Sequence, residues 1–246
     1  MMIIISPAKR QNLDCDNHST AMPAYLAKTK EIIAVMAGFS IDELAKRLNV
    51  SQAIAEEAYR QYQVLVAGLD ENKVVAAINL YQGDVFKHLN VADMTNEDLA
   101  FLQDNLRILS ALYGVVKPFD GIWPYRLEMG TPVFTESLAK YWQPVGLERL
   151  ETEKPKFIFN LASQQYAEMI PRLAGVQWID IVFQDKDKSG QYKVVAVKAK
   201  RMRGEMLRYM IQQRITHPED LLAFKHDQYA FSEAASSPSR LVFRSR

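Results

Sequence analysis

Polar side chains follow two short apolar runs of the sequence, at positions where a ligand could be bound. The runs cover residues 3–5 and 157–159, and the residues that follow them are Ser6, Lys9, Asn160 and Ser163. Each run has the length and composition of a buried strand. In an open sheet, polar groups beyond the carboxyl ends of strands line ligand crevices. Ser163 is also placed to cap a helix, whose free amides attract anions. The alternative is that these residues only complete turns and helix starts.

The segment from Pro124 to Gly130 carries Arg126 and Glu128, two positions apart. In an extended chain, residues with this spacing lie on one face. Two interpretations are equally supported. Either the two side chains form an ion pair that fixes the loop, or Arg126 clamps a phosphate while Glu128 orients it.

Positive charge is concentrated in the C-terminal third. Between residues 186 and 214, nine basic residues face only Asp187 and Glu205, an excess of about +7: Lys186, Lys188, Lys193, Lys198, Lys200, Arg201, Arg203, Arg208 and Arg214. Neutralising a phosphate backbone requires such localised charge, although a solvated basic face has the same composition. Several of these residues are bunched around Gly204, where the backbone is able to approach a ligand closely.

The stretch from residue 44 to 55 has the pattern of two short helices joined by a turn at Asn49, Val50 and Ser51. This pattern is similar to a helix-hairpin-helix, which holds DNA phosphates through backbone amides without reading sequence. Usual examples have glycines where this chain has Asn49 and Ser51. An ordinary helical hairpin explains the same pattern.

No cofactor and no metal site are expected. The four histidines lack ligand spacing, Cys15 is the only cysteine, and no phosphate-binding or dinucleotide-binding glycine motif is present.

Composition indicates one globular domain spanning residues 1–246. Apolar residues make up 48% and charged residues 24%, and the formal net charge is +1. Any contact with nucleic acid must therefore use a local patch. No apolar run approaches the length of a membrane span, and a cytoplasmic location is expected.

The apolar periodicity and turn signals predict an α+β (mixed α/β) fold, in which a mixed β-sheet is flanked by helices. Helices are expected at 24–36, 40–48, 52–64 and 95–113, and after Gly204. Strands are expected at 3–5, 74–78, 157–159, in a hairpin at 178–183 and 191–197, and as an edge strand at 241–243.

Taken in order, seven stretches resemble the YaaA family of bacterial peroxide-stress proteins. They are Ile5–Lys9, Tyr81–Val85, Leu106–Val115, Pro124–Gly130, Asn160–Ser163 with Tyr166, Ala199–Gly204 and Leu241–Phe243. Arg10, Ala111 and Met202 depart from the family's usual threonine, glycine and alanine, but these changes keep the basic charges. The resemblance implies a compact domain with a positively charged cleft and a helix-hairpin-helix near the N-terminus. It also implies DNA binding, protection against hydrogen peroxide and a lowering of free intracellular iron.

We therefore expect a monomeric DNA-binding stress protein that holds the phosphate backbone of duplex or locally unpaired DNA in a basic cleft, with little sequence preference. The expected phosphate-binding residues are Ser6, Lys9, Asn49, Ser51, Arg126, Asn160, Ser163, Lys200, Arg201 and Arg203. The alternative is a glycosylase-like enzyme acting on a nucleobase or nucleotide in the same cleft, which would add Tyr81 to the pocket. In that enzyme Glu128 would be the general acid or base, and Lys9 a nucleophile or phosphate anchor.

Overall fold

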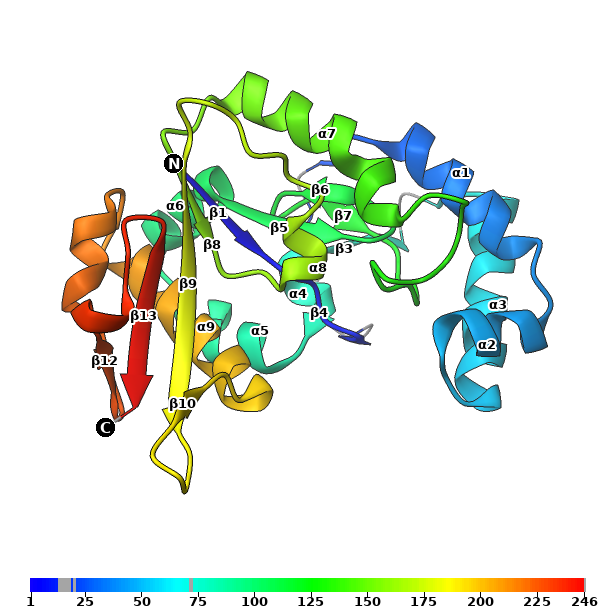
Figure 1. The fold of residues 1–246 in the computed structure, drawn as a ribbon. Coiled ribbons are helices and arrows are strands. Elements are labelled where there is room, and N and C mark those ends of the chain that lie inside the picture. The colour runs from blue at the N-terminus through cyan, green and yellow to red at the C-terminus, as the bar shows by residue number, and fades with distance from the viewer. Residues whose placement is uncertain (13–18, 20, 71–72, 246) are drawn as a thin grey trace.

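A nine-stranded mixed sheet forms the centre of the molecule (Figure 1). The computed structural model describes residues 1–12, 19, 21–70 and 73–245. In spatial order the strands are β11 (Lys225–His226), β12 (Tyr229–Phe231), β13 (Arg240–Ser245), β9 (Gln177–Lys186), β8 (Phe157–Asn160), β1 (Met2–Ile5), β5 (Leu106–Ser110) and β6 (Gly114–Val116), with β10 (Tyr192–Lys193) paired to β9. Two small ribbons, β2 (Arg10–Gln11) with β4 (Tyr81–Gln82) and β3 (Val75–Ala76) with β7 (Gly121–Ile122), lie outside this sheet.

The five strands from β13 to β5 are parallel to one another. Their carboxyl ends therefore lie toward the same edge of the sheet. The register also aligns Asn160 of β8 with Asp180 of β9, and Asp180 with Arg240 of β13. Because side chains alternate between faces along a strand, these three residues share one face of the sheet.

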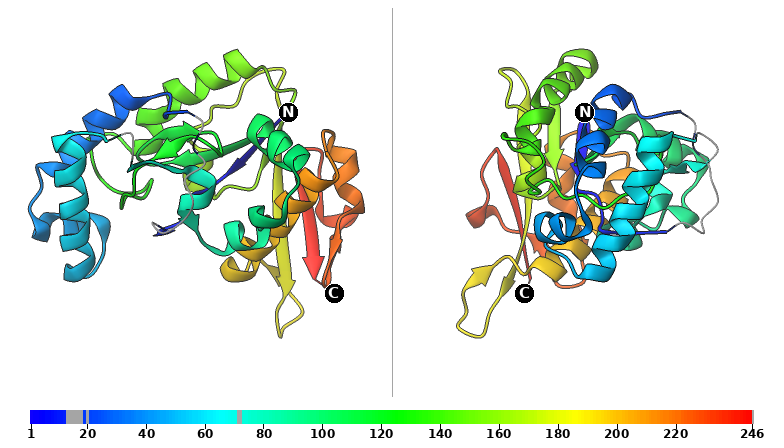
Figure 2. Two further views of the ribbon diagram at one scale, coloured as in Figure 1. Left: turned by 180° about the vertical axis from the view of Figure 1, so that it is seen from behind. Right: turned by 90° about the vertical axis from the view of Figure 1, so that its right-hand side faces the viewer.

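The helices surround this sheet. They are α1 (Leu26–Ala37), α2 (Ile41–Leu48), α3 (Gln52–Ala67), α4 (Ala77–Leu80), α5 (Asp84–Leu89), α6 (Asn96–Asn105), α7 (Leu138–Glu153), α8 (Gln164–Ala167) and α9 (Ala196–Gln212). Three short 3-10 turns are also described, at Val91–Asp93, Pro218–Ala223 and Glu233–Ala235. Figures 1 and 2 show α2 and α3 at the end of the molecule opposite β12 and β13, and the turn between β9 and β10 projecting from the body.

The mixed α/β fold class is confirmed, and so is the capping box at the start of α2. The Ser40 amide donates to Glu43 Oε2 (2.8 Å), and the Glu43 amide donates to Ser40 Oγ (3.3 Å). Residues 3–5 are fully buried in β1, as expected for a strand covered on both faces.

The prediction of a helix at 95–113 is wrong after residue 105. α6 ends at Asn105, and the next five residues form β5. Every residue of β5 is buried. A strand buried on both faces carries apolar residues without alternation, so Leu106 and Leu109 happened to continue the helical spacing.

Four other boundaries also need correction. The second hairpin strand, expected at 191–197, is limited to β10, because α9 begins at Ala196. The last long helix begins at Ala196 and contains Gly204 rather than following it. The strand expected at 74–78 is limited to β3, because Ala77–Leu80 form α4. β13 is an interior strand, since β12 and β11 pair outside it.

Within the described residues, no helix is both long enough and apolar enough to cross a membrane.

Candidate functional site

Ser6, which follows β1, and Ser163, which follows β8, contact each other. The Ser163 amide donates to Ser6 Oγ at 2.9 Å, and the two hydroxyl oxygens are 3.3 Å apart. The Leu161 amide also donates to the Ile4 carbonyl at 3.0 Å, which holds the chain leaving β8 against β1. Parallel pairing of β1 with β8 thus brings together residues 157 positions apart. Both hydroxyls bond each other or backbone, so they fix this edge of the sheet.

A second group of predicted residues is in contact: Lys9, Arg126 and Glu128. Lys9 Nζ lies 2.6 Å from Glu128 Oε1, and an Arg126 Nη lies 3.5 Å from the Lys9 carbonyl oxygen. Of the two sequence interpretations, an ion pair does fix this loop, but Glu128 pairs with Lys9 and not with Arg126. Tyr62 of α3 donates to the Arg126 carbonyl at 2.9 Å and so anchors the segment to that helix.

A cavity of about 230 Å³ lies beside this group. Lys9 and Arg126 line it together with Ile54, Glu57 and Gln61 of α3. The second helix of the N-terminal hairpin therefore lies directly against two of the predicted phosphate-binding residues.

The turn between α2 and α3 closes the end of α2. Asn49 adopts a left-handed conformation, as its residue type permits. Its amide donates to the carbonyls of Ala45 and Lys46, and the Val50 amide donates to that of Ala45. These two amides are therefore already occupied. Ser51 precedes α3 without a side-chain capping bond.

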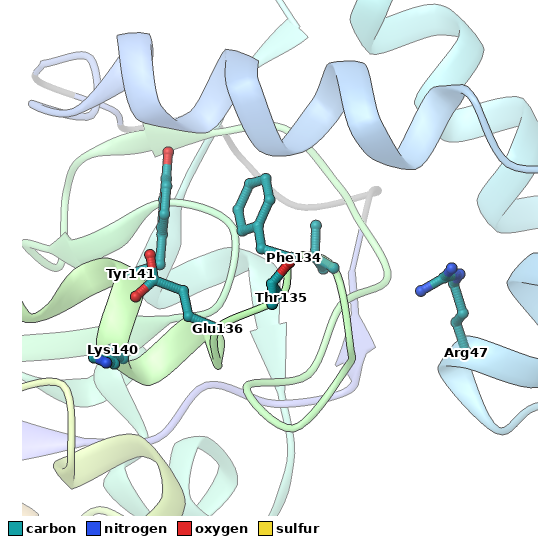
Figure 3. Close-up of a pocket in the computed structure, with 7 residues that line it drawn as sticks. Arg47, Phe134, Thr135, Glu136, Lys140 and Tyr141 are labelled. Carbon is teal, nitrogen blue, oxygen red and sulfur yellow. The ribbon is translucent and has the colours of Figure 1, made fainter.

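Arg47, at the end of α2, connects the hairpin to the rest of the molecule. Its guanidinium donates to the Pro132 carbonyl at 2.6 Å and stacks on the Phe39 ring at 4.0 Å. A shallow cavity of about 980 Å³ separates Arg47 from Phe134 and Tyr141 (Figure 3).

Carboxylates, four of them outside residues 186–214, neutralise much of the C-terminal basic cluster. Five of its nine members are paired: Lys193 with Asp187, Lys198 with Asp185, Arg201 with Asp227, Arg208 with Asp93 and Arg214 with Asp98. The local excess of about +7 is therefore an overestimate. Lys200 is exposed and forms no ion pair with the residues that the structure describes.

Gly204 does not face a ligand. It is buried where α9 packs on α5, and a Cβ there would lie 2.5 Å from the Val85 carbonyl oxygen. The missing side chain of Gly204 therefore allows α9 to approach α5 closely, and not a ligand. Next to it, Glu205 pairs with His88 (2.8 Å) and His226 (3.2 Å), which fixes α9 from both sides.

Asn160 and Arg203 line another cavity, of about 620 Å³, at the end of β8. Asn160 is buried, and its Nδ2 donates to Asp180 Oδ1 at 2.7 Å. Burial lowers the pKa of Arg203. The cavity that includes Lys9 and Arg126 has different lining residues, so the predicted residues are divided between two places.

Sequence reasoning missed four residues of this cavity: Arg172, Trp178, Asp180 and Arg240. Trp178 Nε1 donates to Asp180 Oδ1 at 2.7 Å, and the Arg172 guanidinium lies 3.7 Å from the centre of the Trp178 ring. An arginine and a tryptophan near a predicted strand are a weak signal. Only the strand register shows that Asp180 and Arg240 lie beside Asn160.

Tyr81, which the enzyme alternative placed in the pocket, is fully buried. Its hydroxyl lies 2.9 Å from that of Tyr125, which is 2.8 Å from Ser110 Oγ. Burial raises the pKa of Tyr81, so this phenol stays protonated at neutral pH.

In the described part of the chain, no group of three or more His, Cys, Asp or Glu side chains is arranged to hold a metal ion. Cys15 lies outside the described residues.

Together these observations define a mixed α/β protein in which the predicted basic residues Lys9, Arg126 and Arg203 are divided between two separate cavities. The model of the family described as peroxide stress protein YaaA matches residues 1–235. Similar proteins include UPF0246 proteins of Acaryochloris marina (35% identical), Bordetella petrii (34%) and Francisella tularensis (33%), each match covering 99% of both chains. The chain belongs to the YaaA family of peroxide stress proteins.

Proposed function

We propose that this protein binds DNA through its phosphate backbone, as its part in the response to peroxide stress. The proposal rests on the position of Lys9 and Arg126, whose side chains line the same cavity beside α3. Arg126 forms no ion pair with any residue of the described ranges, and its carbonyl is held by Tyr62. This bond fixes the backbone of Arg126, and the planar guanidinium of an arginine matches the geometry of a phosphate group.

The hairpin of α2 and α3 extends this surface. The amides of Asn49 and Val50 are used within α2, so a phosphate near the turn would be met by Ser51 and the first amides of α3. Lys200, at the start of α9, adds an exposed positive charge. Contacts of this kind favour phosphates over bases and give little sequence preference.

The number of free cations sets the expected salt dependence. Arg126, Lys186, Lys188 and Lys200 have no carboxylate partner among the residues described. Each phosphate neutralised contributes about −0.9 to the slope of log Kobs against log salt. If these four alone contact phosphates, the slope should be about −3.6, with a further −0.9 if Lys9 leaves Glu128.

Fluorescence anisotropy with a short duplex at several salt concentrations tests the proposal. Arg126→Ala and Lys200→Ala should each weaken binding and flatten the slope by about 0.9. Lys156→Ala is the matched control, because Lys156 is exposed and lies just before β8, away from the carboxyl ends of the strands. The proposal is refuted if Arg126→Ala and Lys156→Ala bind DNA with the same slope as the unchanged protein.

The lowering of free iron that the family resemblance implies would then follow from DNA binding rather than from iron storage. Iron present in stoichiometric amount in the purified protein would contradict an indirect effect.

A further inference from the structure

The cavity at the end of β8 has features that the binding of an extended DNA backbone would not explain. It lies at the carboxyl end of a parallel strand, on the sheet face shared by Asn160, Asp180 and Arg240. β8 ends at Asn160 while β9 continues to Lys186, and Arg203 of α9 lines the cavity with Ile181 and Val182 of β9, beyond the end of β8. Its volume of about 620 Å³ lies within the range of pockets for small molecules.

Arg203 is a half-buried cation without a protein partner among the described residues. Its guanidinium makes no hydrogen bond and no ion pair with the residues that the structure describes, and its Nε is buried from solvent. A buried donor without an acceptor is unfavourable, and more so when it carries charge. Proteins therefore seldom bury an arginine unless an anion balances it.

Arg240 is a second arginine at this cavity whose side chain has no partner in the described ranges. It lies beside Asp180 in the sheet register, but Asp180 is already engaged. Asp180 Oδ1 accepts from Asn160 and Trp178, and the carboxylate lies 3.8 Å from Arg172.

The other carboxylate at the cavity, that of Glu168, is exposed and accepts from Gln164 at 3.4 Å. Three arginines against two carboxylates leave a net positive charge at the cavity. The two arginines without a carboxylate partner here are Arg203, whose Nε is buried, and Arg240, which is exposed.

We propose that this cavity binds a phosphate monoester of about mononucleotide size, with the phosphate held between Arg203 and Arg240. Two guanidinium groups match the charge of about −2 of a terminal phosphate better than the single charge of an internal phosphodiester. The same terminal phosphate occurs on a free nucleotide and at the end of a DNA strand. The inference does not depend on DNA binding at Lys9 and Arg126, which line a different cavity.

Isothermal titration calorimetry on the full chain, with no DNA present, tests this proposal. A deoxynucleoside 5′-monophosphate should bind, and the matching nucleoside should not. Arg203→Met keeps the length of the side chain without its charge, and should weaken binding at least tenfold. Arg240→Ala, at an exposed position, should weaken it severalfold, while Lys156→Ala should bind like the unchanged protein.

A second measurement identifies the source of the phosphate. A short duplex with 5′-phosphate ends should compete with the mononucleotide better than the same duplex with 5′-hydroxyl ends if strand ends are the ligand. Equal competition by the two duplexes would assign the cavity to free nucleotides. The proposal is overturned if neither the mononucleotide nor inorganic phosphate binds at millimolar concentration, or if Arg203→Met and Arg240→Ala bind as tightly as the unchanged protein. Because no DNA is needed for the first experiment, its failure leaves the DNA-binding proposal to be judged separately.

Discussion

Replacing Gly204 by alanine tests how closely α9 must pack on α5. An added Cβ would lie 2.5 Å from the Val85 carbonyl oxygen and 2.7 Å from His88 Cβ. The Val85 oxygen belongs to the backbone of α5 and is not free to rotate away, so one helix must shift. Overpacking of this kind costs about 1–3 kcal/mol, and the backbone contact places Gly204→Ala in the upper part of that range.

Alanine also recovers part of this loss, since it favours a helix over glycine by about 1 kcal/mol. The net destabilisation expected for Gly204→Ala is therefore about 1–2 kcal/mol. In a chain of this size, 1 kcal/mol lowers the unfolding midpoint by about 2–4 °C. Thermal and urea unfolding of the variant should show a decrease of roughly 2–8 °C and a lower urea midpoint.

Gly38→Ala is the matched control. Gly38 has right-handed backbone angles, with φ −78° and ψ −13°, and an added Cβ would lie 3.4 Å from its nearest neighbour, the Val35 carbonyl oxygen. This substitution should change the stability by no more than about 0.5 kcal/mol. If Gly204→Ala unfolds at the same midpoint as the unchanged protein, α9 does not pack on α5 as closely as described. The position of Arg203, one residue away, would then have to be reconsidered.

Two further substitutions test individual charges. The hydrogen bond from Arg214 (2.5 Å) lowers the pKa of Asp98, so its stabilisation is present above about pH 4 and is lost as the pH falls through the lowered pKa. Asp98→Asn should lower the urea midpoint at neutral pH and reduce its decline in acid; an unchanged decline would contradict this role. Glu128→Gln removes the carboxylate that pairs with Lys9. It should strengthen DNA binding and steepen the salt slope by up to about 0.9, opposite in sign to Lys9→Ala. Weaker binding in anisotropy titrations would refute this.

Local signals in the sequence predicted several elements correctly. Ser40 and Glu43 form the expected capping box because both partners lie within one helical turn. Ser6 and Ser163, which were identified as polar residues following two strands, contact each other because neighbouring parallel strands end at the same edge of a sheet. In both cases a short-range or general rule was sufficient.

Features that depend on distant parts of the chain were not predictable in this way. Which residue faces Asn160 is decided by the register of β9 and β13, so Asp180 and Arg240 could not be identified from spacing. The end of α6 at Asn105 was missed because β5 is buried on both faces and shows no alternation. In each case the deciding interaction joins segments that are far apart in sequence.

The basic cluster shows why the position of each charge matters more than the total. Carboxylates pair with five of its nine members, which leaves Lys186, Lys188, Lys200 and Arg203 among the described residues. The three lysines are exposed and hydrated, so they need no partner and are free to exchange counterions for the phosphates of a passing polyanion. Arg203 is half-buried and its Nε is shielded from solvent without an acceptor, so hydration stabilises it less. The two proposals therefore use two kinds of unpaired positive charge: exposed lysines for an extended backbone at the surface, and Arg203 for a discrete phosphate in the cavity at the end of β8.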